Sequence, residues 1–92
     1  MKSHWIRCLV SPGMFSSERL VVIEEPGKGV VTSLFVDRTL VEVDEELRSE
    51  APVPGRLRVE VGPVSDRMNV FLPVSSIEHG RVVSLPAALL AS

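Results

Sequence analysis

Apolar and polar residues alternate with a period of two through much of the chain, which predicts β-strands rather than helices. The cleanest alternation covers residues 55–62, where Leu and Val occupy every second position and Arg and Glu stand between them. One apolar face and one charged face are typical of an antiparallel strand that lies against a core. Further strands are predicted over residues 5–10, which have apolar groups on both faces, and over 19–25, 68–72 and 81–85.

The longest β-forming run covers residues 30–43, is rich in β-branched residues and contains neither Pro nor Gly. Its apolar side chains change phase: Leu34 and Val36 have even numbers, whereas Val41 and Val43 have odd numbers. A shift of one residue turns every side chain to the other face, so the run needs a bulge or a corner. We place this corner at Asp37–Thr39, and we expect it to curl the sheet.

Three segments share one local pattern, at residues 35–41, 71–77 and 84–90. Each ends a strand, places Asp or Pro next and returns to apolar residues three positions later. Pro presets the backbone for the first position of a turn, and Asp caps a short helix. We therefore expect a single turn of 3₁₀- or α-helix after each of Asp37, Pro73 and Pro86.

The segments between the predicted strands carry turn residues. Pro26–Gly29 predicts a hairpin that pairs residues 19–25 with the front half of the run 30–43. Ser11–Gly13 predicts a turn, after which Met14 and Phe15 are expected to fold back onto the core. The acidic segment 44–50 is compatible with one helical turn but is better described as an exposed loop.

These elements predict a single all-β domain over residues 1–92, with five or six short antiparallel strands. The preferred architecture is a small, partly open barrel of the SH3-like or OB-like kind, and a two-sheet β-roll is the alternative. Composition agrees, because Val dominates the apolar residues and only one Trp and three Phe are present.

Charge and cysteine content narrow the classes of function. The formal net charge of −2 does not indicate a nucleic-acid binder, although Arg56, Arg58 and Arg67 leave room for a local basic patch.

Cys8 is the only cysteine, so no disulfide forms within the chain, which favours a cytoplasmic protein. Arg7 interrupts the apolar start, which is therefore not expected to act as a signal peptide. No segment of the sequence approaches the ~20 consecutive apolar residues that a helix needs to span a bilayer.

The sequence predicts no catalytic, cofactor-binding or metal-binding residue. His4 and Cys8 would lie about 13 Å apart on a strand, too far to share an ion. Cys8 belongs to an apolar alternation, which indicates a core thiol rather than a nucleophile. The acidic pairs Glu24–Glu25 and Glu45–Glu46 are adjacent residues, which face opposite ways on a strand or lie in a loop.

One segment resembles part of a known family. Gly80–Pro86 is similar to the Gly-Arg-Val…Pro segment of swapped-hairpin bacterial transcription regulators. The likeness covers seven residues, and in that family the segment opens the domain and further strands follow it. Because the likeness is this short, we assign no functional role to any residue of this chain from that family.

Three classes of function remain, and the sequence does not select one. The preferred hypothesis is a non-catalytic protein-interaction module that forms a homo-oligomer, because the apolar residues Trp5 and Leu9 are predicted on an outer face and small sheets have edges that need cover. The alternative is a nucleic-acid-binding barrel; its candidate residues are Arg7, Arg56, Arg58 and Arg81. The third possibility is a small-molecule binder or enzyme with its site at a subunit interface.

Overall fold

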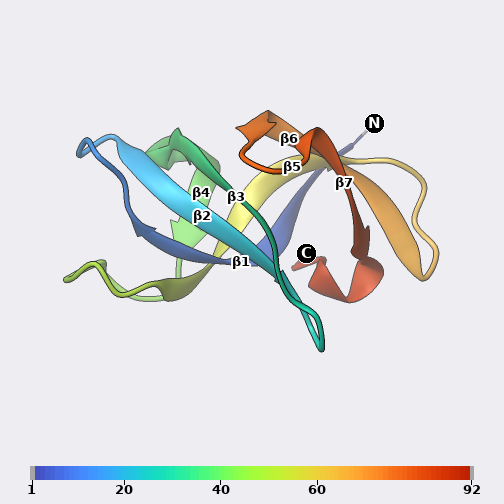
Figure 1. Ribbon diagram of the computed structural model, residues 1–92, viewed down its shortest axis with the longest axis horizontal. Coiled ribbons are helices and arrows are strands. Elements are labelled where there is room, and N and C mark those ends of the chain that lie inside the picture. The colour runs from blue at the N-terminus through green and yellow to red at the C-terminus, as the bar shows by residue number, and fades with distance from the viewer. Residues whose placement is uncertain (1, 92) are drawn as a thin grey trace.

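Figure 1 shows a computed structural model of the chain, in which residues 2–91 are described. Its elements in chain order are β1 (Lys2–Pro12), β2 (Glu18–Glu25), β3 (Gly29–Asp37), the 3₁₀-helix η1 (Arg38–Leu40), β4 (Val41–Val43), β5 (Val53–Val61), β6 (Arg67–Ser76), β7 (Gly80–Pro86) and the 3₁₀-helix η2 (Ala87–Leu89).

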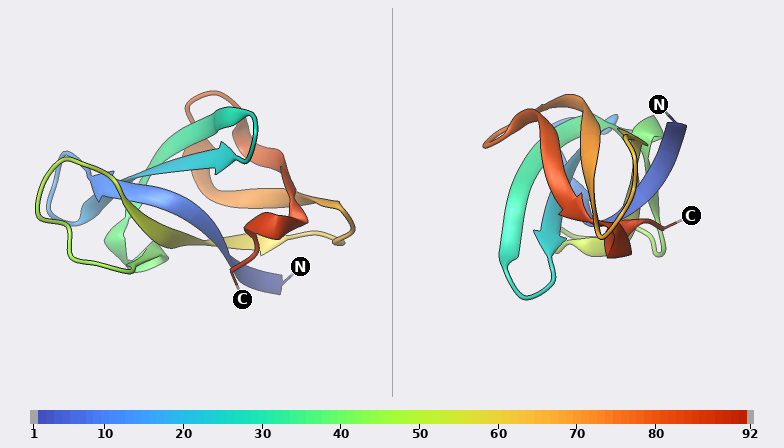
Figure 2. Two further views of the ribbon diagram at one scale, coloured as in Figure 1. Left: turned by 90° about the horizontal axis from the view of Figure 1, so that it is seen from below. Right: turned by 90° about the vertical axis from the view of Figure 1, so that its right-hand side faces the viewer.

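The strands form one antiparallel sheet in the order β3-β2-β1-β5-β6-β7, and the short β4 pairs with β5 beside this path. The sheet curls into a half-barrel, which is clearest in the right-hand view of Figure 2. The prediction of a small, partly open all-β barrel is confirmed. The strands found within residues 2–91 belong to one continuous sheet rather than to a two-sheet roll.

The sheet curls because neighbouring strands pair along only part of their lengths. β1 pairs with β5 from Lys2 to Val10, but with β2 only from Leu9 to Pro12. β5 pairs with β6 only at Glu60 and Val61. The strands diverge on either side of these short ladders, and each divergence leaves a cavity at the surface.

The core lies inside the curl and consists of the inward-facing apolar side chains that the alternation predicted. Its fully buried members include Ile6, Val10, Val21, Ile23, Leu34, Leu57, Val70 and Leu85. Leu89 of η2 closes one end of this core, and the segment after it follows β1, because the Ala91 amide donates to the Trp5 carbonyl at 2.8 Å.

Two of the three predicted corners are helical turns. η1 follows Asp37, whose carboxylate accepts hydrogen bonds from the Thr39 amide at 2.9 Å and from the Thr39 hydroxyl at 2.8 Å. η2 follows Pro86, which precedes it in extended conformation. The prediction was right at these two sites because the residue that ends the strand, Asp37 or Pro86, directly precedes the helical turn in the sequence.

The prediction of a helical turn after Pro73 was wrong, because Pro73 lies inside β6. Pairing between β6 and β7 is interrupted between Phe71 and Ser76, and a bulge of this kind tolerates a proline that has no amide hydrogen to donate. The Arg81 guanidinium donates to the carbonyl oxygens of Leu72 and Pro73, both at 3.3 Å. Arg81 thus replaces the missing ladder bonds at the bulge.

Candidate interaction site

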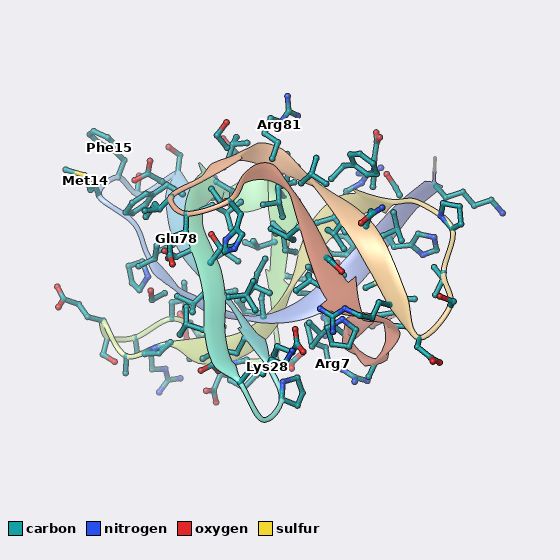
Figure 3. The ribbon with its side chains drawn as sticks, turned by 45° about the vertical axis from the view of Figure 1, so that its right-hand side comes forward. Arg7, Met14, Phe15, Lys28, Glu78 and Arg81 are labelled. Carbon is teal, nitrogen blue, oxygen red and sulfur yellow. The ribbon has the colours of Figure 1, made fainter. Side chains whose placement is uncertain are left out.

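The β1–β2 loop, residues 13–17, projects the two most exposed large apolar side chains among residues 2–91. Met14 is 81% exposed and Phe15 is 68% exposed. The expectation that both side chains fold back onto the core is wrong. Figure 3 shows them pointing away from the body of the molecule.

Hydrogen bonds hold this loop in a fixed shape and explain why it does not reach the core. The Gly13 amide donates to the Glu18 carbonyl at 3.1 Å, and the Glu18 amide donates to the Phe15 carbonyl at 3.0 Å. The Met14 amide donates to the Glu18 carboxylate at 2.9 Å. The Arg38 amide donates to the Ser17 carbonyl at 2.8 Å, which ties the loop to η1. The loop closes on itself, so its apolar side chains remain in solvent.

A second feature lies at the other end of β2, where β2 and its hairpin diverge from β1. The gap is a cavity of about 400 Å³, which we call the wedge cavity. Its lining consists of Arg7, Cys8, Leu9, Glu24, Glu25, Pro26, Gly27, Gly29 and Leu89. Figure 3 shows Arg7 and the hairpin residue Lys28 at this end, away from Met14 and Phe15. The wedge cavity thus has apolar walls and a charged rim.

An ion pair connects the rim of the wedge cavity to the far end of the sheet. The Arg67 guanidinium donates to both carboxylate oxygens of Glu25, at 3.0 and 3.1 Å. The same guanidinium donates to the hydroxyl and the carbonyl of Ser84, at 3.2 and 3.0 Å. Because Glu25 ends β2 while Arg67 and Ser84 belong to β6 and β7, this cluster bridges the open side of the half-barrel.

The surroundings of the carboxylate and the thiol at the wedge cavity shift the pKa values of both groups. Hydrogen bonds from Arg67 lower the pKa of Glu25, and contacts with Lys28 act in the same direction, so the carboxylate is held ionised. Burial raises the pKa of the Cys8 thiol to about 12, which is the opposite of nucleophile activation. Glu24, next in sequence to Glu25, is exposed.

The predicted interface residues Trp5 and Leu9 lie on the outer face of β1, and both are half-buried. Leu9 contributes to the wall of the wedge cavity. Trp5 stands opposite Arg58 of β5 in the antiparallel ladder. The structure therefore joins Leu9, but not Trp5, to the wedge cavity.

The four predicted nucleic-acid residues form two pairs. Arg7 and Arg56 are opposite each other on β1 and β5. Arg58 and Arg81 line a second cavity of about 220 Å³, together with Phe71. Arg56 is neutralised by Asp44 at 2.8 Å and Glu42 at 3.4 Å, and Arg7 donates to the Ala88 carbonyl at 3.2 Å.

Comparison with protein-family models, with curated proteins and with solved structures gave no match. Within residues 2–91, no helix is long and apolar enough to cross a membrane. Over the same range, no group of three or more His, Cys, Asp or Glu side chains is placed to hold a metal ion.

Proposed function

We propose that this protein is a non-catalytic protein-interaction module that associates with copies of itself in the cytoplasm. The observation that carries the proposal is the β1–β2 loop, which holds Met14 and Phe15 in solvent by its own hydrogen bonds. A loop whose backbone is already fixed loses little backbone entropy on binding. Exposed apolar groups at a fixed position are typical of an interaction site.

The edge of the sheet supports self-association. β3 is the last strand at one end of the sheet, and residues 30–36 contain no charged residue and no proline. Charges and prolines are the usual protection of an edge strand against pairing with another chain. Inside the molecule, the Ile77 amide donates to the Ser33 carbonyl at 2.9 Å and covers the middle of this edge. Phe35 and Val30 on the same strand remain exposed.

Sedimentation velocity over a series of protein concentrations tests the proposal. The weight-average mass is expected to rise above the 10.1 kDa of one chain as the concentration increases from low to high micromolar. Apolar contacts between copies follow mass action, so dilution must reverse the change. A mass that stays at one chain over the whole series contradicts self-association.

A second candidate function is the binding of single-stranded nucleic acid, which one arrangement favours. Trp5 and Arg58 are cross-strand neighbours, and Arg58, Phe71 and Arg81 line the second cavity. Aromatic rings beside cations form the usual surface for single strands.

Fluorescence anisotropy with labelled oligonucleotides of mixed sequence tests this candidate at low salt. Binding is expected to weaken as salt increases, and Arg58→Gln is expected to reduce the salt slope by about 0.7, the value for one lost phosphate contact on a single strand. Arg56→Gln is the matched control, because Asp44 and Glu42 already neutralise that guanidinium. Absence of binding at low salt contradicts the candidate.

A further inference from the structure

We propose that the copies associate head to tail, with Met14 and Phe15 of one copy inserted into the wedge cavity of the next. This inference rests on the proposed self-association and specifies its geometry. The two surfaces belong to the same chain, so every copy offers one of each.

The positions of the two surfaces require a head-to-tail arrangement. The β1–β2 loop precedes β2 and the hairpin at the wedge cavity follows it, so the two lie at opposite ends of this strand (Figure 1). A head-to-tail contact between two different surfaces of one chain repeats from copy to copy and produces either a closed ring or an open series. The expected product is a series of oligomers rather than a single dimer.

The wedge cavity has the size and the walls that two apolar side chains need. Its volume of about 400 Å³ falls in the range of cavities that hold small organic groups. Leu9, Pro26 and Leu89 provide apolar walls. Gly27 and Gly29 form part of the hairpin wall, and both have positive φ, with open space where a side chain would stand. The hairpin backbone is therefore accessible to an incoming side chain.

Charge also favours the head-to-tail arrangement over one in which identical ends meet. The β4–β5 loop lies at the same end of the molecule as the β1–β2 loop, as Figure 1 and the left view of Figure 2 both show. Residues 44–51 of that loop carry four carboxylates. Asp44 pairs with Arg56 and Glu46 with Arg48, which leaves the charges of Glu45 and Glu50 unbalanced. Around the wedge cavity the cations Arg7, Lys28 and Arg67 outnumber the carboxylates Glu24 and Glu25, so this end has a net positive charge. Contact between unlike ends brings opposite charges together, whereas contact between two loop ends brings carboxylates together. The same carboxylates disfavour an anionic lipid surface as the partner.

Three variants test whether association depends on the β1–β2 loop and on the wedge cavity rather than on other exposed apolar side chains. Met14→Ser with Phe15→Ser removes the projecting side chains, and Leu9→Lys places a charge in the wall of the wedge cavity. Val64→Ser is the control, because Val64 is an exposed apolar residue (48%) that lies in the β5–β6 loop, away from both surfaces and from the β3 edge. Circular dichroism and Trp5 fluorescence verify that each variant is folded.

Sedimentation velocity of the single variants and of their mixture gives the decisive result. The loop variant and the Leu9→Lys variant are each expected to be monomeric where the wild type is oligomeric, and Val64→Ser is expected to behave as the wild type. An equimolar mixture of the loop variant and Leu9→Lys is expected to form a 1:1 dimer and nothing larger, since the mixture contains one intact loop and one intact cavity per pair. If Leu9→Lys does not fold, Arg7→Glu replaces it at the exposed rim.

The outcomes distinguish this inference from the proposed function. A wild type that remains monomeric overturns both. A wild type that associates while the loop variant associates equally well overturns the head-to-tail geometry and leaves self-association standing. The same holds if the mixture of loop and cavity variants stays monomeric, because an interface between identical surfaces is not restored by mixing. The wild type could instead bind vesicles of phosphatidylcholine and phosphatidylserine while its sedimentation mass in solution stays that of one chain. That result overturns the choice of a second copy as partner.

Discussion

Replacement of Gly55 by alanine is expected to lower the free energy of unfolding by about 2 kcal/mol, in the range for an overpacked core. Gly55 lies in β5, where it is paired with Val43 of β4 in the antiparallel ladder. A Cβ atom there would lie 2.5 Å from the Glu42 carbonyl oxygen and 2.9 Å from a methyl group of Val10. The carbonyl belongs to the backbone of β4, which pairs with β5 on both sides of this contact, so it cannot rotate away. Urea unfolding followed by Trp5 fluorescence measures the loss.

Gly62→Ala is the control for the Gly55 prediction. A Cβ atom at Gly62 would meet its nearest neighbours, the Asn69 carbonyl oxygen and the Phe71 ring, at 3.8 Å, which is ordinary contact. Alanine at such a position also restricts the unfolded chain, so this variant is expected to be as stable as the wild type or slightly more stable. Equal stability of the two alanine variants would show that β4 does not press against β5 as described.

The faces and approximate limits of the strands were predictable because they are local properties. Period-two alternation assigns each side chain to the core or to the outside, and Leu57, Val59 and Val61 are buried as predicted. The corner at Asp37 was predictable because its two partners are close in sequence. The Asp37 carboxylate caps the turn by accepting a hydrogen bond from the amide of Thr39, two residues later. At Pro73 the same local signal gave the wrong structure, since a proline also fits a bulge and only the pairing with β7 decides between them.

The order of the strands was not predictable from alternation. β1 lies between β2 and β5, and its partner residues in β5 are some fifty positions away in sequence. A pattern of buried and exposed residues fixes which face of a strand is apolar, but it does not say which neighbour completes the ladder. The two divergences, and hence both cavities, follow from this pairing rather than from any motif.

The candidate site was predictable only in part, for physical reasons that differ between residues. Leu9 was placed on the outer face by alternation, and it does line the wedge cavity. Met14 and Phe15 were assigned to the core because they are apolar, but hydrogen bonds within the loop decide where they point. The ion pair of Glu25 with Arg67 joins residues that are 42 positions apart, and no local pattern indicates it.

Acidification is expected to destabilise the protein through this ion pair. Hydrogen bonds from Arg67 hold the pKa of Glu25 below its ordinary value of 4.5. A carboxyl with a lowered folded-state pKa binds protons more readily when unfolded, so its full contribution to stability is present above pH 4.5 and is lost as the pH falls through the folded-state pKa. The thermal unfolding midpoint, measured by circular dichroism between neutral pH and pH 3, is expected to fall on this account.

Glu25→Gln isolates the contribution of this residue from that of the other carboxylates. The variant is expected to unfold at a lower temperature than the wild type at neutral pH, and the difference is expected to shrink as the pH falls below 4.5, because the wild-type carboxyl becomes neutral as well. Glu24→Gln, at the exposed neighbouring position, provides the control and should follow the wild type at every pH. A difference between Glu25→Gln and the wild type that is constant with pH would mean that Arg67 does not bind an ionised Glu25. In that case the open side of the half-barrel is held by the Ser33–Ile77 hydrogen bond and the core alone.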